Sequence, residues 1–125
     1  MSRLEIAETG NTPYILFDPS TNVFKIEGKS FPEDCKEFYA PVIAWLDKFK
    51  AIDPKTFTLY FNLFYLSSSS IISVKQLLLK LVTFQAAGTD VTVIWSYDED
   101  DDDIKKTGED YLKITKLKFQ FKVNP

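Results

Sequence analysis

Four consecutive serines, Ser67 to Ser70, are the most concentrated group of side chains in this sequence that could carry chemistry. They lie between an apolar run that ends at Leu66 and a second that begins at Ile71. A serine hydroxyl can cap a helix by accepting a hydrogen bond from an unpaired backbone amide, which stabilises the helix by about 1 kcal/mol. Capping needs one serine or two, so the remaining hydroxyls are available for another role.

The position of the serines suits a phosphate. In open α/β sheets, ligands and modifications gather beyond the carboxyl ends of parallel strands, where helix N-termini point their free amides. A phosphate attached there is stabilised by the helix dipole and by those amides. Ser68 and its neighbours are therefore candidates for phosphorylation, although a serine loop that only caps a helix remains an alternative.

An acidic run follows the next apolar strand, and it comprises Asp98, Glu99, Asp100, Asp101, Asp102 and Asp103. If that strand is parallel to its neighbour, the run lies at the same edge of the sheet as the serines. A calcium loop of the EF-hand type needs glycine where Asp103 stands, so we expect no metal site. We expect a solvated loop that forms part of a partner surface and that a phosphate on the serines would repel.

Several kinds of catalysis are excluded by missing residues. The sequence contains no histidine, a single cysteine and only four glycines. Ser-His-Asp and Cys-His catalysis are therefore impossible, and no glycine-rich phosphate loop is present. We predict that the protein is not an enzyme and uses no cofactor, with catalysis by carboxylates alone as the remaining alternative.

Charge and composition limit the partners. The net charge of −3 opposes binding to nucleic acid, because that binding depends on neutralising phosphates with lysine and arginine. No stretch resembles a signal peptide or a membrane span. The lone Cys35 cannot form an intramolecular disulfide, which agrees with a reducing compartment. These features predict a cytoplasmic protein.

The first half of the chain predicts a hairpin and then a helix. Apolar runs at 14–17 and 23–26 flank a cluster of turn residues, and Gly28 is expected to end the second strand. Ser30 and Glu33 have the spacing of a capping box, which predicts that a helix starts there. Pro41 is expected to kink that helix or to split it near Ala40.

The second half alternates strands and helices. The run 57–66 predicts a central strand with one face composed of Phe57, Leu59, Phe61, Leu63 and Tyr65. A helix over 71–87, a strand over 91–95, a weaker helix from about 105 to 115 and a strand over 118–123 follow. We therefore predict a single α/β domain over residues 1–125, in which a mixed sheet has an N-terminal β-hairpin followed by parallel βαβ units.

The motifs together resemble one family. Tyr65 to Ser70 looks like the phosphosite segment of the SiaC family of regulatory phosphoproteins, which are STAS-like domains similar to anti-sigma factor antagonists. Other segments that resemble this family are residues 28–33, 38–46, 95–101 and 108–111. The resemblance covers nearly the whole chain.

The resemblance implies a bacterial signal-transduction protein that works by partner switching. A partner kinase and a partner phosphatase act on the serine loop, and the unmodified form binds and regulates an effector, a diguanylate cyclase in the characterised branch. The implied acceptor is Ser68, while Ser67, Ser69 and Ser70 shape its loop. Ser67 stands where Asn or Asp is usual, and Ser69 is an alternative acceptor. The other hypothesis is a constitutive STAS-like module that binds a protein or a small ligand without phosphorylation.

Overall fold

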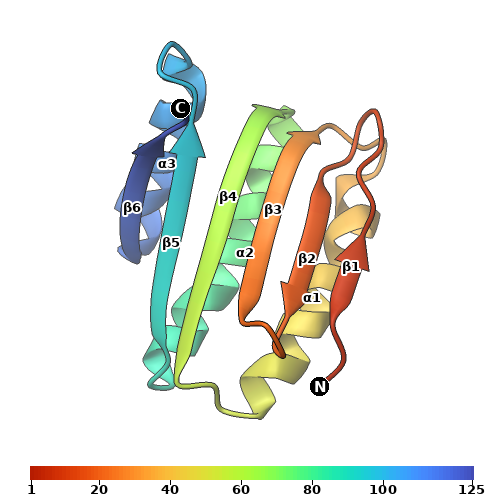
Figure 1. Cartoon of the computed structure of the whole chain (residues 1–125), viewed down its shortest axis with the longest axis vertical. Helices are drawn as coiled ribbons and strands as arrows, with labels where there is room; N and C mark the ends of the chain where they lie inside the picture. Colours follow the sequence, from red (N-terminus) through yellow and green to blue (C-terminus); the bar gives the residue numbers. More distant parts are fainter.

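The computed structural model describes all 125 residues as six strands and three helices. The elements along the chain are β1 (Leu4–Ile6), β2 (Tyr14–Asp18), β3 (Val23–Ser30), α1 (Cys35–Ala51), β4 (Thr56–Leu66), α2 (Ser68–Ala86), β5 (Asp90–Tyr97), α3 (Asp102–Thr115) and β6 (Lys118–Val123). Figure 1 shows them coloured along the sequence.

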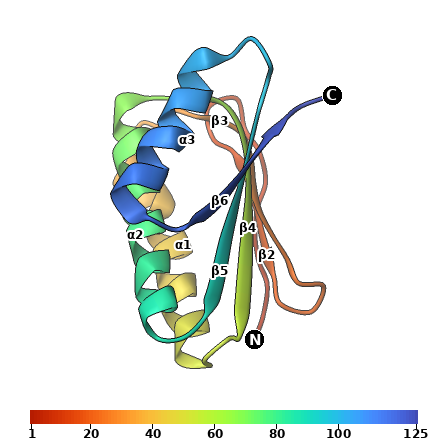
Figure 2. The same cartoon turned by 90° about the vertical axis from the view of Figure 1, so that its left-hand side faces the viewer.

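The six strands form one sheet in their order along the chain, from β1 to β6. β1, β2 and β3 pair antiparallel, whereas β3, β4, β5 and β6 pair parallel. The predicted hairpin and the predicted βαβ units are therefore confirmed. All three crossover helices lie against one face of the sheet, and the other face is left uncovered (Figure 2).

The hydrophobic core fills the space between the sheet and the helices. On β4 the side chains at alternate positions from Phe57 to Leu63 point into it and are fully buried. Aromatic rings pack closely there: the centroids of Phe24 and Phe57 are 4.6 Å apart, and those of Phe61 and Trp95 are 5.1 Å apart. Edge-on and tilted ring contacts at such distances add to the free energy gained from burying apolar area.

The end of β4 departs from strict alternation. Gly28 on β3 pairs with Leu63, but Lys29 pairs with Tyr65, so the register passes over Phe64. Tyr65 is consequently 52% exposed and Leu66 only 9% exposed, and the prediction that Tyr65 shares the buried face is wrong. The prediction that Gly28 ends the strand is also wrong, because its φ of +115° lets β3 continue through this irregularity to Ser30.

The first helix begins later than the sequence pattern predicts. Asp34 is the N-cap, and its carboxylate accepts a hydrogen bond from the Glu37 amide at 3.0 Å. Ser30 does not cap the helix, because it ends β3 and its hydroxyl is buried. Pro41 does not split the helix, which continues from Cys35 to Ala51.

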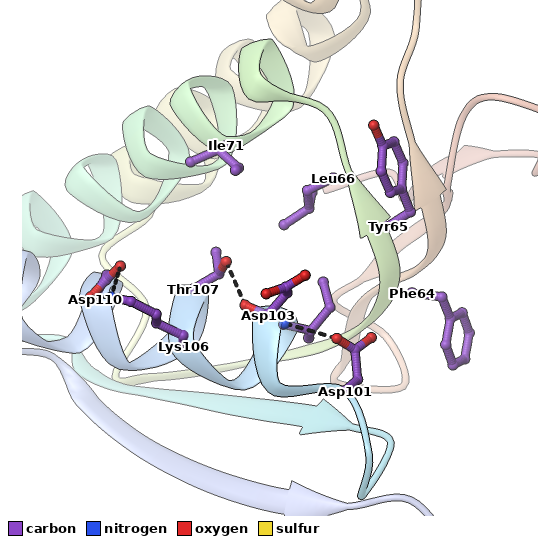
Figure 3. A pocket seen from close by; sticks show the side chains of 10 residues that line it. Phe64, Tyr65, Leu66, Ile71, Asp101, Asp103, Lys106, Thr107 and Asp110 are labelled. Carbon is purple, nitrogen blue, oxygen red and sulfur yellow. Dashed lines mark hydrogen bonds and ion pairs between the residues drawn. The ribbon is translucent and has the colours of Figure 1, made fainter.

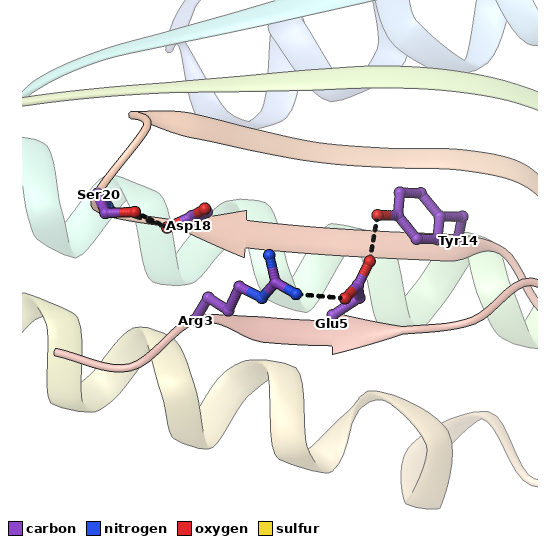
Figure 4. Close-up of polar contacts among 5 residues, drawn as sticks. All are labelled: Arg3, Glu5, Tyr14, Asp18 and Ser20. Carbon is purple, nitrogen blue, oxygen red and sulfur yellow. Dashed lines mark hydrogen bonds and ion pairs between the residues drawn. The ribbon is translucent and has the colours of Figure 1, made fainter.

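The edge strand β1 is too short and too polar to be predicted from its sequence. Its Glu5 accepts a hydrogen bond from the Tyr14 hydroxyl of β2 at 2.6 Å and pairs with Arg3 at 3.1 Å (Figure 4). The hydrogen bond to Glu5 raises the pKa of Tyr14. At the other end of β2, hydrogen bonds from Ser20 lower the pKa of the Asp18 carboxyl.

The helix α3 lies directly on Trp95 of β5. The indole N–H of Trp95 donates to the Ile104 carbonyl at 2.9 Å, and the ring faces Gly108. A Cβ added at Gly108 would lie 2.5 Å from the indole ring, so only glycine permits this close approach. Trp95 thereby fixes the position of α3 on the sheet.

We predict that Gly108→Ala lowers the free energy of unfolding by about 1 to 3 kcal/mol, since a methyl group would force α3 away from Trp95. Urea denaturation measures the change. The matched control is Gly10→Ala, because a Cβ at Gly10 meets no atom within 4 Å and should have little effect. A Gly108→Ala protein as stable as the wild type would contradict the tight packing.

Candidate functional site

The candidate site lies at the edge of the sheet where β3, β4 and β5 end. Because these strands are parallel, the helices α1, α2 and α3 all begin at this edge. The serines follow β4 and the acidic run follows β5, as predicted, and both lie at the upper end of the molecule in Figure 1. The adjacent placement of the two features is therefore confirmed.

Two of the four serines maintain the local structure. Ser67 is the N-cap of α2, and its hydroxyl oxygen accepts a hydrogen bond from the Ser70 amide at 3.1 Å. Ser70 is fully buried, and its hydroxyl contacts that of Ser67 at 3.0 Å. Neither hydroxyl is free in this conformation to act as an acceptor of phosphate.

The Ser70 hydroxyl belongs to a buried polar network that joins three elements. It lies 2.8 Å from the hydroxyl of Ser30 on β3, and Ser30 in turn shares a hydrogen bond of 2.7 Å with the Tyr39 hydroxyl of α1. The Cys35 thiol lies 3.4 Å from the same Ser70 oxygen. Burial raises the pKa of Tyr39 to about 12, so Tyr39 stays neutral at physiological pH. The network therefore fixes the serine loop through uncharged groups.

Ser68 and Ser69 have no such structural role. Both are exposed at the first two positions of α2, and their hydroxyls make no hydrogen bond to another protein group. Their amides are also unpaired: the Ser67 amide donates to Ser30, the Ser70 amide to Ser67, and the first helical bond runs from Ile71 to Ser67. An exposed hydroxyl beside two free amides at a helix N-terminus is a favourable place for a phosphate.

The acidic run is only partly the solvated loop that the sequence predicts. Asp101 is the N-cap of α3, where its carboxylate accepts a hydrogen bond from the Ile104 amide at 3.0 Å, and Asp102 and Asp103 form the first turn. The helix thus begins three residues earlier than expected, because carboxylates stabilise its N-terminus. Asp98 lies in the preceding turn and accepts a hydrogen bond from Asn124 at 2.9 Å.

A pocket of about 540 Å³ separates the serine helix from the acidic helix (Figure 3). The residues that line it are Phe64, Tyr65, Leu66, Ile71, Asp101, Asp103, Ile104, Lys106, Thr107 and Asp110. It is continuous with both predicted features, since Leu66 and Ile71 flank the serines and Asp101 and Asp103 belong to the acidic run. Three other members of the run, Asp98, Glu99 and Asp100, line a separate hollow with Asn124 and Pro125, and Asp102 lines neither.

One hydrogen bond connects the serine helix with α3. The buried Tyr111 hydroxyl donates to the Ile71 carbonyl in the first turn of α2 at 2.7 Å. Burial raises the pKa of Tyr111, so the hydroxyl keeps the proton that it donates. A displacement of the first turn of α2 would therefore alter the hydrogen bond that Tyr111 of α3 makes to it.

The residues that sequence reasoning missed are the buried partners of the loop. The sequence pattern indicated Ser30 only as a helix cap and Cys35 only as a lone thiol, and it gave no role to Tyr39. No sequence signal brings β3, α1 and α2 together at these side chains, because Ser30 lies 9 positions from Tyr39 and 40 positions from Ser70. No group of three or more His, Cys, Asp or Glu residues is placed to hold a metal ion. None of the three helices combines the length and the hydropathy that a membrane span requires.

Comparison with known proteins gives consistent matches. A family model described as SiaC family regulatory phosphoprotein matches residues 6–124. The crystal structure of apo-SiaC from Pseudomonas aeruginosa has 28% identity and a TM-score of 0.90, and the match covers 98% of this chain and all of that one. A second similar structure is that of the diguanylate cyclase SiaD in complex with its activator SiaC from the same organism. It matches with 27% identity and a TM-score of 0.90 over 97% of this chain and 99% of that one. An uncharacterized protein of P. aeruginosa strain UCBPP-PA14 is 29% identical over 119 residues, which are 95% of this chain and 94% of the relative.

We predict that Ser70→Ala lowers the free energy of unfolding by about 1 to 3 kcal/mol, because it removes one of the two hydroxyl partners of the buried Ser30 and the hydroxyl partner of Ser67. Ser69→Ala is the matched control, since its exposed hydroxyl has no partner and its loss should cost less than about 0.5 kcal/mol. Chemical denaturation of both variants gives the comparison. Equal stability of the two would refute the assigned network.

Proposed function

The chain belongs to the SiaC family of regulatory phosphoproteins, and we propose that it is a phosphorylation-switched protein-interaction module whose phosphate acceptor is Ser68. The observation that carries this proposal is the division of the serine cluster. Ser67 and Ser70 are held by hydrogen bonds, whereas Ser68 is exposed beside unpaired amides. A phosphate on Ser68 can be added without breaking any contact of the fold.

Ser69 is the alternative acceptor. It is also exposed, but it lies toward α1, in a groove that it shares with Cys35 and Lys36. Ser68 is preferred because its position corresponds to the hydroxyl residue of the family's phosphosite segment. Ser67, Ser69 and Ser70 then define the conformation of the loop around it.

The proposed effector is a diguanylate cyclase. In P. aeruginosa the similar protein SiaC is the activator of the cyclase SiaD, with which it forms a complex. We propose that the unmodified form of this chain binds its cyclase in the cytoplasm, that a kinase and a phosphatase set the level of modification, and that the chain itself catalyses no reaction. The acidic run from Asp98 to Asp103 adjoins the serines and is proposed as part of the partner surface.

The switch predicts opposite behaviour of two Ser68 variants. Tagged wild-type chain and Ser68→Ala should capture a diguanylate cyclase from the native cell, and Ser68→Asp should capture much less, because a fixed negative charge imitates the phosphate in part. Mass spectrometry identifies the captured proteins and locates phosphoserine in the wild-type chain.

Ser69→Asp is the control that separates the two candidate acceptors. Equal capture by Ser68→Ala and Ser68→Asp, with no phosphoserine within residues 67–70 under several growth conditions, would favour a constitutive binding module instead. Loss of capture only in Ser69→Asp would transfer the acceptor role to Ser69.

Phosphorylation should also increase the local dynamics of the acidic run and of the N-terminal end of α3. A phosphate carries a charge of about −1.5 to −2 and would face the carboxylates of the acidic run, so repulsion should increase amide hydrogen exchange in residues 97–109. Mass spectrometry of the phosphorylated and unmodified protein measures this exchange. The strand β2, which is remote from the site, is the internal reference. Identical exchange in residues 97–109 in both forms would disprove the coupling.

A further inference from the structure

The pocket between β4, α2 and α3 has two chemically different walls. One wall is apolar and is formed mainly by Leu66 and Ile71, at the end of β4 and in the first turn of α2. The opposite wall is the start of α3, with the carboxylates of Asp101 and Asp103 (Figure 3). The pocket can therefore receive an apolar side chain and hold a neighbouring positive charge.

The charge in the pocket is unbalanced. Asp101, Asp103 and Asp110 contribute three carboxylates, and Lys106 is the only lysine or arginine that lines it. Lys106 already pairs with Asp110 at 3.4 Å, so it does not neutralise the other two. Asp101 and Asp103 are thus available to a cationic partner, because the N-capping bond of Asp101 uses only one of its oxygens.

The apolar wall is also incompletely covered. Ile71 is among the exposed large hydrophobic side chains, and it is 37% exposed. An exposed apolar surface that is rimmed by polar groups is typical of a protein-interaction site. Ile71 lines this pocket, whereas other exposed apolar residues such as Ile52 do not.

On the basis of the proposed function, we infer that this pocket receives the effector, through a segment that carries an apolar side chain next to a lysine or arginine. The segment places its apolar side chain against Leu66 and Ile71 and its cation against Asp101 and Asp103. Such a pairing combines burial of apolar area with charge complementarity, which sets the orientation of the partner.

Only part of the acidic run belongs to the proposed docking site. Only Asp101 and Asp103 of the run line the pocket, whereas Asp98, Glu99 and Asp100 line the hollow beside the C-terminus. A phosphate on Ser68 has the same sign as the pocket carboxylates, so it does not repel a basic segment directly. It acts by pushing the start of α3 away from the start of α2, which separates the two walls that the segment must contact together.

Neighbouring residues offer matched variants. Asp103→Lys and Asp102→Lys make the same change of charge in the same turn of α3, but only Asp103 lines the pocket. Ile71→Ser and Ile72→Ser remove the same side chain in the same turn of α2, but Ile72 lies in the groove shared with α1 and is the more exposed of the two, at 54%. Each pair therefore controls for net charge, helix stability and expression.

The experiment measures the binding of the purified cyclase partner to the full-length unmodified chain by titration calorimetry. Asp103→Lys and Ile71→Ser should each weaken binding by about tenfold or more, and Asp102→Lys and Ile72→Ser should change it by less than about threefold. Asp103→Asn is a milder variant that keeps the side-chain shape and should give an intermediate loss. Thermal unfolding confirms that each variant is folded.

The outcomes distinguish the inference from the function on which it rests. Wild-type binding that is weakened equally by both members of each pair, or by neither, would overturn the pocket as the docking site. Tighter binding by Asp103→Lys would show that the partner segment is acidic and would overturn the proposed chemistry. Failure of the wild-type chain to bind the cyclase would instead refute the proposed function, and the docking site would fall with it.

Discussion

The handedness of the chain crossovers is the constraint on which the rest of this structure depends. Each of the three crossovers joins a strand to the parallel strand beside it, and all three step in the same direction across the sheet. Because such crossovers are right-handed, every helix is placed on the same face, as Figure 2 shows. The starts of α1, α2 and α3 are then adjacent at one edge, and the serines, the acidic run and the pocket between them follow from that arrangement.

This edge is fixed by contacts that leave the candidate acceptor free. The network of Tyr39, Ser30 and Ser70 joins α1, β3 and α2 through neutral hydroxyls. A buried polar network of this kind is stabilising only when all its members are satisfied, and no buried side-chain polar atom of the protein lacks a partner. Ser68 is therefore exposed on a loop that hydrogen bonds hold in place, which suits the proposed modification.

The same edge also has a route by which a local change can spread. Tyr111 connects α3 to the Ile71 carbonyl in the first turn of α2, and Trp95 fixes the position of α3 on the sheet through the Ile104 carbonyl. These two hydrogen bonds link α3 to the serine helix and to the sheet. A charge added to the serines would act on a small, connected group of helix ends rather than on the whole fold.

The sequence by itself determined the order of the elements after β1, the hairpin, the parallel units and the position of the serines beyond a parallel strand, because apolar periodicity and turn residues are local signals. It also excluded histidine-dependent catalysis, since composition alone decides that point. Only the tertiary structure decided which serines are free, because Ser67 and Ser70 are distinguished from Ser68 and Ser69 by contacts with Ser30 and with each other. The exposure of Tyr65 and the pocket likewise depend on register and packing between distant segments, which no local pattern records.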